Sequence, residues 1–327
     1  MGVIIMEENY MLAKEIVKQK FPRGSGIDEF LIIGLYGLLS KYSNHKDIVK
    51  SAFLDTDIYI EHGTLRQIFH KHNIELDSFK YNEERELQGN ATYAVSSLGN
   101  TICLENGKLK LEKRKPFIVA SIDMIGITSL LISFIHEMGH IIKGYNNGYA
   151  MKENNNIVFG YIRSGLCIDG ISFYKDSNEY YNYNSMEILD EVVNVLQTME
   201  AMQEIKALEG FIPDKNVENF FNLLNKNLFD KNEVYKKSVR AFKPLWESID
   251  FKELIENNIV EGRLKRIKSS FDRRTYKGAF KDLGDLLDDI DESKYSGGDF
   301  IFDLISNLRI KRIINKYKKN KPYQKKK

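Results

Sequence analysis

The sequence predicts an α+β fold in which a small mixed or antiparallel sheet packs on one buried helix and a mostly helical C-terminal subdomain follows. Apolar residues recur at helical spacing through most of the first 80 residues, whereas they alternate with polar residues between positions 102 and 111. After Pro213 the patterns are helical and carry no strand signal. With 327 residues, of which 43% are hydrophobic, the chain can bury a large core.

We predict four parts along the chain. They are an N-terminal helical segment over residues 1–85, a core over 86–212, a helical subdomain over 213–308 and a basic tail over 309–327. The helical segment holds four predicted helices, and Pro22 with the glycines that follow it separates the first two. These helices cover residues 10–21, 27–42, 47–53 and 64–72.

Strand signals begin near residue 90. Asn106 and Gly107 stand between two alternating runs, an arrangement that predicts a β-hairpin with a two-residue turn. Residues 117–120 are rich in β-forming side chains and predict a further strand. Asp123 can cap the apolar helix that follows, and Gly144 marks the end of that helix.

A second hairpin is predicted over residues 157–175. Residues 178–185 are polar and rich in tyrosine, and we interpret them as a loop. Ser185 can then cap a long helix over residues 186–208. The remaining helical patterns cover residues 217–228, 231–249, 251–267 and 275–290, with a last short helix before the tail.

Charge and cysteine usage indicate the cellular setting. The N-terminus lacks a secretion signal, and the run 117–135 is better explained by a strand and a buried helix than by a membrane span, so we expect a cytoplasmic protein. Two cysteines, Cys103 and Cys167, do not make a disulfide framework. From Arg309 onward the chain holds ten lysines and arginines and no acid. We interpret this tail as a solvated end, with contact to nucleic acid or an anionic surface as the less favoured alternative.

The motif with the clearest chemistry lies inside the apolar run 127–142. His136, Glu137 and His140 form an HExxH sequence, and residues four apart share one face of a helix. The two imidazoles can therefore bind one metal ion, and Glu137 can take a proton from water beside it. The alternative is a helix with two hydrogen-bonded histidines on its exposed side.

A metal site of this kind needs a third protein ligand. Lys143 and Asn146 stand where a three-histidine pattern requires glycine and histidine, so a glutamate from the helix over 186–208 is the better candidate. Of its four glutamates, Glu191 lies at the margin of the apolar face, where a ligand can be held beside a packed surface. The alternative role for Glu191 is a salt bridge at that boundary.

With these residues, the region 90–208 resembles the gluzincin branch of zincin metallopeptidases. The resemblance implies that His136, His140 and Glu191 bind Zn²⁺, that Glu137 is the general base and that a tyrosine or histidine stabilises the oxyanion. Tyr183 is the candidate for that last role, and the competing donors are Tyr180, Tyr181 and Arg163. The chain departs from the family in lacking a clean signature after Glu191 and in the length of the hairpin over 157–175.

The resemblance implies a zinc-dependent endopeptidase that acts on a peptide or protein substrate. We expect the substrate to add itself to an exposed strand edge within residues 92–104. The alternative is a metal-binding or regulatory protein on the same scaffold, with little peptidase activity, that acts through its helical C-terminal region.

Overall fold

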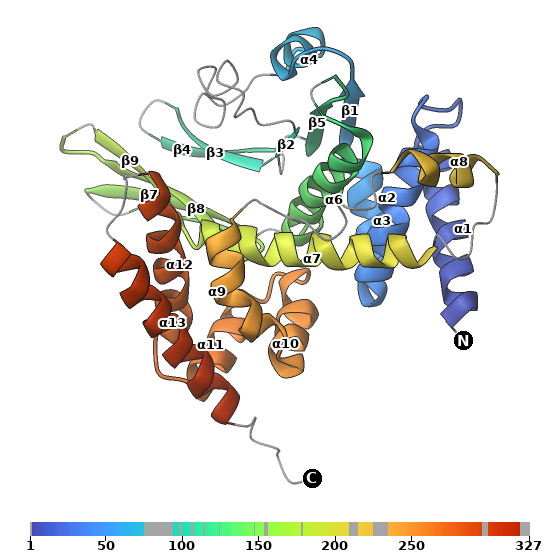
Figure 1. The fold of residues 1–327 in the computed structure, drawn as a ribbon. Coiled ribbons are helices and arrows are strands. Elements are labelled where there is room, and N and C mark those ends of the chain that lie inside the picture. The colour runs from blue at the N-terminus through green and yellow to red at the C-terminus, as the bar shows by residue number, and fades with distance from the viewer. Residues whose placement is uncertain are drawn as a thin grey trace, which may run out of the picture. The chain divides into compact units, whose positions relative to one another are not determined.

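A computed structural model gives the chain an α+β architecture, as predicted, in which helices predominate (Figure 1). The chain forms two compact units, and neither is continuous in sequence. Unit 1 comprises Met1–Asn100, Lys113–Ile142 and Gln197–Asn232, and unit 2 comprises Thr101–Glu112, Lys143–Leu196 and Glu233–Lys327. The four-part division at residues 85, 212 and 308 stays a prediction. The structure describes residues 2–74, 94–97, 100–105, 108–113, 115–123, 125–146, 148–153, 156–177, 179–208, 215–224, 235–295 and 300–320.

Four helices begin unit 1 at the predicted segments, but the first of them starts at Gly2 and not at residue 10 as predicted. They are α1 (Gly2–Lys20), α2 (Asp28–Lys41), α3 (Lys46–Asp55) and α4 (Leu65–Lys71). Helix α2 is buried along most of its length, because its sequence is almost uninterruptedly apolar from Phe30 to Leu39. The Thr64 hydroxyl accepts the amide of Gln67, and the Gln67 side chain accepts the amide of Thr64, so a capping box begins α4. Among the described residues, helix α8 (Lys215–Leu223) is the last element of this unit.

The sheet of unit 1 is mixed, in the order β1-β5-β2. Strand β5 (Phe117–Ser121) pairs in parallel with β1 (Asp57–Glu61) and in antiparallel with β2 (Ala94–Ser97). Helix α4 covers part of this sheet, since its Leu65, Ile68 and Phe69 pack on Val119. Packing of the sheet on the buried helix stays a prediction.

One strand of this region was not predicted, and one expectation is wrong. Residues 57–61 lie between two predicted helices and form the strand β1, and five residues give too short an alternation to be recognised. Asp123 does not cap the buried helix, which begins at Ile127. Its carboxylate instead lies 2.6 Å from Nδ1 of His62 and accepts the amide of Gly63 at 2.7 Å.

The predicted hairpin around Asn106 and Gly107 has its two strands, β3 (Asn100–Glu105) and β4 (Lys108–Lys113), paired with each other. The two turn residues themselves lie outside the described residues. The second hairpin is also confirmed as β7 (Ile157–Ser164) and β8 (Cys167–Tyr174), joined by a tight turn at Gly165 and Leu166. Gly165 has φ +56°, a conformation that glycine adopts without strain.

In unit 2, β7 and β8 belong to a four-stranded antiparallel sheet that also holds β6 (Gly148–Glu153) and β9 (Glu179–Ser185) (Figure 1). The loop predicted over 178–185 is therefore wrong. Seven residues of β9 pair with β8, from Glu179 opposite Tyr174 to Ser185 opposite Ile168. Three tyrosines favour the strand, whereas the asparagines between them suggest a turn. A single residue, Met186, separates β9 from the next helix, and it is buried with φ +69°.

The C-terminal part of unit 2 is helical, as predicted. The single helix expected over 251–267 is wrong, because one helix ends at Ile259 and the next covers Leu264–Arg274. The helices of this part are α9 (Lys236–Trp246), α10 (Ile249–Ile259), α11 (Leu264–Arg274), α12 (Ala279–Tyr295) and α13 (Phe300–Lys319). An aromatic cluster forms its centre, in which Phe251 packs against Phe242, Phe271 and Tyr317. Among the described residues, no helix combines the length and the apolarity that a membrane span requires.

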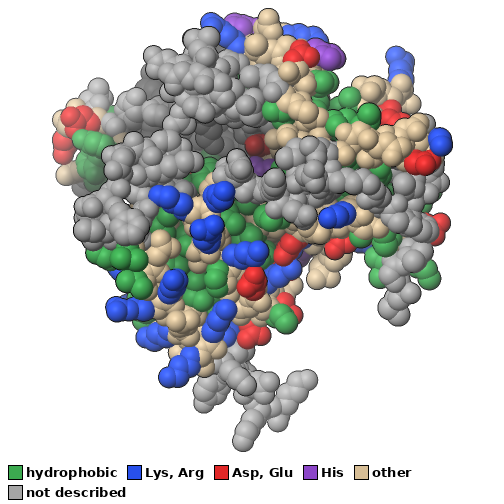
Figure 2. All heavy atoms as spheres, viewed as in Figure 1, with side chains coloured by type: hydrophobic (Ala, Val, Ile, Leu, Met, Phe, Trp, Pro, Cys, Tyr) green, Lys and Arg blue, Asp and Glu red, His purple; other side chains and the backbone are tan. Residues whose placement is uncertain are grey.

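The solvated tail expected from Arg309 is wrong for residues 309–319, which complete α13. Ile310, Ile313, Ile314 and Tyr317 are at most 4% exposed, because they recur at helical spacing on the face that packs in unit 2. The bases lie on the opposite face. Figure 2 shows lysine and arginine side chains gathered over the helices of this unit, and the exposed bases of α13 are Arg309, Lys311, Arg312, Lys316, Lys318 and Lys319.

Candidate metal centre

The helix that carries the histidines is α6 (Ile127–Gly144), and it ends at the predicted glycine. Most of its apolar residues are buried, with Leu131, Phe134 and Met138 fully so. His136, Glu137 and His140 are half-buried on the remaining face. The sequence therefore places three polar side chains at the edge of a packed surface, where they keep access to solvent and to one another.

Helix α7 (Glu187–Leu208) is the long helix predicted over residues 186–208. In unit 1, two glycines of α2 allow close helix packing. A Cβ at Gly34 would lie 2.7 Å from Phe134 of α6, and a Cβ at Gly37 would lie 2.8 Å from Ile205 of α7. A side chain at either glycine would therefore require the neighbouring residue, Phe134 or Ile205, to move.

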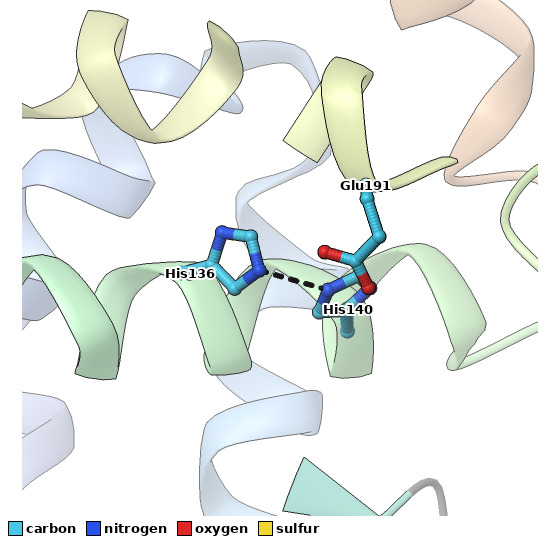
Figure 3. A group of neighbouring side chains, drawn as sticks. All are labelled: His136, His140 and Glu191. Carbon is cyan, nitrogen blue, oxygen red and sulfur yellow. Dashed lines mark hydrogen bonds between the residues drawn. The ribbon is translucent and has the colours of Figure 1, made fainter. Parts of the chain in front are cut away.

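The structure brings the predicted ligand residues together (Figure 3). One ligand atom from each of His136, His140 and Glu191 lies within 4.8 Å of the other two, and all three residues are half-buried. The two Nε2 atoms are 3.1 Å apart, and the rings are inclined by 78°. In Figure 3 the carboxylate of Glu191 comes from α7 and points toward the imidazole of His140.

This spacing can be compared with what a metal ion requires. Two ligand atoms that each lie about 2.0–2.1 Å from one tetrahedral zinc ion are separated by about 3.3 Å. The 3.1 Å between the imidazole nitrogens is close to that value. The limit of 4.8 Å within which all three ligand atoms lie is wider than that value. Rotation of the Glu191 side chain can bring its carboxylate closer to the two nitrogens. The three residues thus form a group that could hold a metal ion.

Among the described side chains, the structure brings no expected oxyanion donor to the group of His136, His140 and Glu191. The backbone of Tyr183 pairs with Gly170 in the β8–β9 ladder, and its side chain lies outside the described residues, as does that of Tyr180. Tyr181 is 56% exposed and donates a 3.1 Å hydrogen bond to Glu179, which raises the pKa of the Tyr181 phenol. Arg163 donates to the carbonyl of Asn146 at 3.4 Å, and burial lowers the pKa of its guanidinium.

Sequence reasoning missed a buried ion pair next to the candidate ligands. Lys143 and Asp190 are almost completely buried, with Nζ and Oδ2 3.0 Å apart. Oδ1 of the same carboxylate accepts the amide of Leu166 at 2.8 Å. The available signal was a lysine within the apolar end of α6, immediately before Gly144.

The donor set has a defined chemistry. Two imidazole nitrogens and one carboxylate are ligands typical of zinc sites that keep a fourth position for water or substrate. Glu137 adds a carboxylate on the same helix, and a carboxylate near such a position can exchange a proton with water. No family model, curated protein or solved structure matches the chain.

Proposed function

We propose that the protein is a zinc-dependent hydrolase that cleaves peptide bonds in a peptide or protein substrate. The observation that supports this proposal most directly is the group formed by His136, His140 and Glu191, with Glu137 beside the first histidine on the same helix. This arrangement combines three metal donors with a carboxylate that can serve as a base, and metal-assisted hydrolysis can use such groups. The resemblance of the motif to gluzincin peptidases favours peptide bonds as the substrate.

Each residue has a separate task in this proposal. His136, His140 and Glu191 hold the ion. A zinc ion bound there supplies Lewis acidity and lowers the pKa of a bound water to about 7. The Glu137 carboxylate accepts a proton from the attacking water and delivers it to the leaving amine, and so acts first as base and then as acid. Tyr183 remains our candidate for the donor that stabilises the oxyanion.

The substrate strand can add to the edge of the unit 1 sheet. Strand β2 is the last strand in the order β1-β5-β2 among the described residues, and it lies within the predicted region 92–104. An edge strand offers backbone donors and acceptors to an extended peptide, as in other cases of β-strand addition. We therefore propose that residues 94–97 bind the substrate backbone.

The first experiment measures metal content after purification in the presence of zinc. We expect one zinc per chain, and we expect His140→Ala and Glu191→Ala to lose it. Glu187→Ala is the matched control, since Glu187 lies one turn before Glu191 on α7 and is exposed. Absence of zinc in the parent, or retention of zinc in Glu191→Ala, would refute the ligand set.

A metal-binding or regulatory protein with little peptidase activity is the second candidate. The observation that favours it is the fixed basic face of α13, whose exposed lysines and arginines are available to an anionic partner (Figure 2). Cleavage of a peptide library distinguishes the two functions. A zinc-loaded parent that cleaves no member of the library would favour this second candidate.

A further inference from the structure

We propose that the buried pair of Lys143 and Asp190 positions Glu191 as a metal ligand. The inference rests on the metal site proposed above and does not depend on peptide hydrolysis. It concerns two residues that belong to the same helices as the ligands. Lys143 follows His140 by three residues on α6, and Asp190 immediately precedes Glu191 on α7.

Helix periodicity places the lysine on the ligand face. His136, His140 and Lys143 are separated by four and three residues, so they project from the same side of α6. The Lys143 ammonium group reaches α7 at Asp190, where it lies 3.0 Å from Oδ2 and 3.4 Å from the backbone carbonyl oxygen. The lysine therefore binds both the side chain and the main chain of the residue beside Glu191.

The carboxylate of Asp190 is also held from a second direction. Its Oδ1 accepts the amide of Leu166 at 2.8 Å, in the turn between β7 and β8. Gly165, which precedes Leu166 in that turn, leaves room for the Asp190 carboxylate. A Cβ at Gly165 would lie only 2.5 Å from Oδ1 of Asp190. Asp190 thus joins the end of α6, the first turns of α7 and the β7–β8 turn at one point.

Stability alone is a weak explanation for this pair. The side chains of Lys143 and Asp190 are 0% and 5% exposed, so both charges have lost most of their hydration. The attraction between two buried charges often does no more than offset that loss, and apolar residues of similar volume commonly stabilise a fold equally well. An ion pair also fixes geometry, because its directional hydrogen bonds hold Lys143 of α6 and Asp190 of α7 in one relative position.

The position of Asp190 determines where the side chain of Glu191 points. Successive residues of a helix are rotated by about 100°, so fixing the carbonyl and carboxylate of Asp190 also fixes the direction in which the Glu191 side chain leaves α7. Groups that orient a metal ligand typically contribute about 10–100-fold in metal affinity. We expect a loss of that size when the pair is broken.

The experiment compares zinc affinity, by competition with a chelator, in the parent, Lys143→Met, Asp190→Asn and the double variant. Asparagine keeps an acceptor for the Leu166 amide, and the double variant leaves no unpaired charge. We expect both single variants to bind zinc about 10–100-fold more weakly. Compared with the single variants, the double variant should regain thermal stability but should not regain zinc affinity. The absorption spectrum of bound Co²⁺ should lose intensity in all three, because Glu191 leaves its position.

Ile267→Ala is the matched control, because Ile267 is a fully buried residue of α11, a helix that carries neither the ion pair nor a candidate ligand, and its truncation lowers stability. It should bind zinc as the parent does. Parental affinity and an unchanged cobalt spectrum in the folded double variant would overturn the proposal, as would affinity that simply follows melting temperature across all variants. A parent that binds zinc and cleaves no peptide would refute the hydrolase and leave the positioning role intact.

Discussion

Ending the chain after Asn307 should unfold the helical part of unit 2. The truncation removes the second half of α13, with Ile310, Ile313, Ile314 and Tyr317, each at most 4% exposed. It also removes the contacts of Arg274 with Tyr317 and leaves its contact with Asp250. The Arg274 guanidinium carbon lies 3.7 Å from the centre of the Tyr317 ring, and its Nη2 donates to the Tyr317 carbonyl. Without them, the aromatic cluster around Phe271 opens to water.

The size of the effect follows from the buried side chains. Burial of one large apolar side chain stabilises a fold by about 1.5–3 kcal/mol, so four contribute roughly 6–12 kcal/mol. This figure is an upper estimate, since the unfolded chain already buries some of the same surface. A whole domain is stable by only about 5–15 kcal/mol, so the loss is comparable with the total.

The assay is thermal unfolding followed by circular dichroism. The matched control ends after Asn320, which keeps α13 and the hydrogen bonds between Asn320 and Arg274. The control should melt near the parent, whereas the chain ended after Asn307 should lose the transition of unit 2. A point variant, Ile310→Ala, should lower stability by about 2–5 kcal/mol. If both truncated chains melt at the parental temperature, our account of α13 is wrong.

Three further outcomes are expected. Glu137→Gln should keep zinc and lose peptide cleavage by several orders of magnitude, because only the proton acceptor is removed; parental turnover would contradict its role. Tyr183→Phe should lower turnover far more than substrate affinity, while Tyr181→Phe should change neither, and the reverse result would transfer the oxyanion role. Burial and the hydrogen bond to Asp282 raise the pKa of Tyr276 from 10.0 to about 12. Its neutral phenol thus contributes stability below pH 10 that is lost as the pH rises through 12. Stability should fall less over that range in Tyr276→Phe, and equal slopes would contradict the shift.

The sequence was informative where a pattern is long and local. The helices α2, α6 and α7 follow from periods sustained over ten residues or more, and the hairpin of β7 and β8 from alternation on both sides of a glycine turn. Strand β1 has five residues and gives too little alternation to compete with the helices beside it. Strand β9 depends on its pairing with β8, which no local pattern reveals.

The candidate site also has a part that local sequence patterns predict and a part that they do not. His136 and His140 are related by helix spacing, and the phase of α7 selects Glu191 from four glutamates, so the proximity of these three residues could be predicted from two local patterns. The ion pair of Lys143 and Asp190 could not. It joins residues 47 positions apart, and the sequence alone does not give the geometry that brings them within hydrogen-bonding distance.

The junction at Met186 restricts how sequences with this site can differ in length. Strand β9 is paired with β8 up to Ser185, and α7 begins only two residues later at Glu187. One inserted residue would therefore turn Glu191 by about 100° around α7 and move it about 1.5 Å along the axis. Longer loops can accommodate an inserted residue, whereas the single residue between β9 and α7 cannot. In a search for distant sequences, the six-residue step from Ser185 to Glu191 should be a more stringent filter than the roughly fifty residues between the HExxH motif and the glutamate.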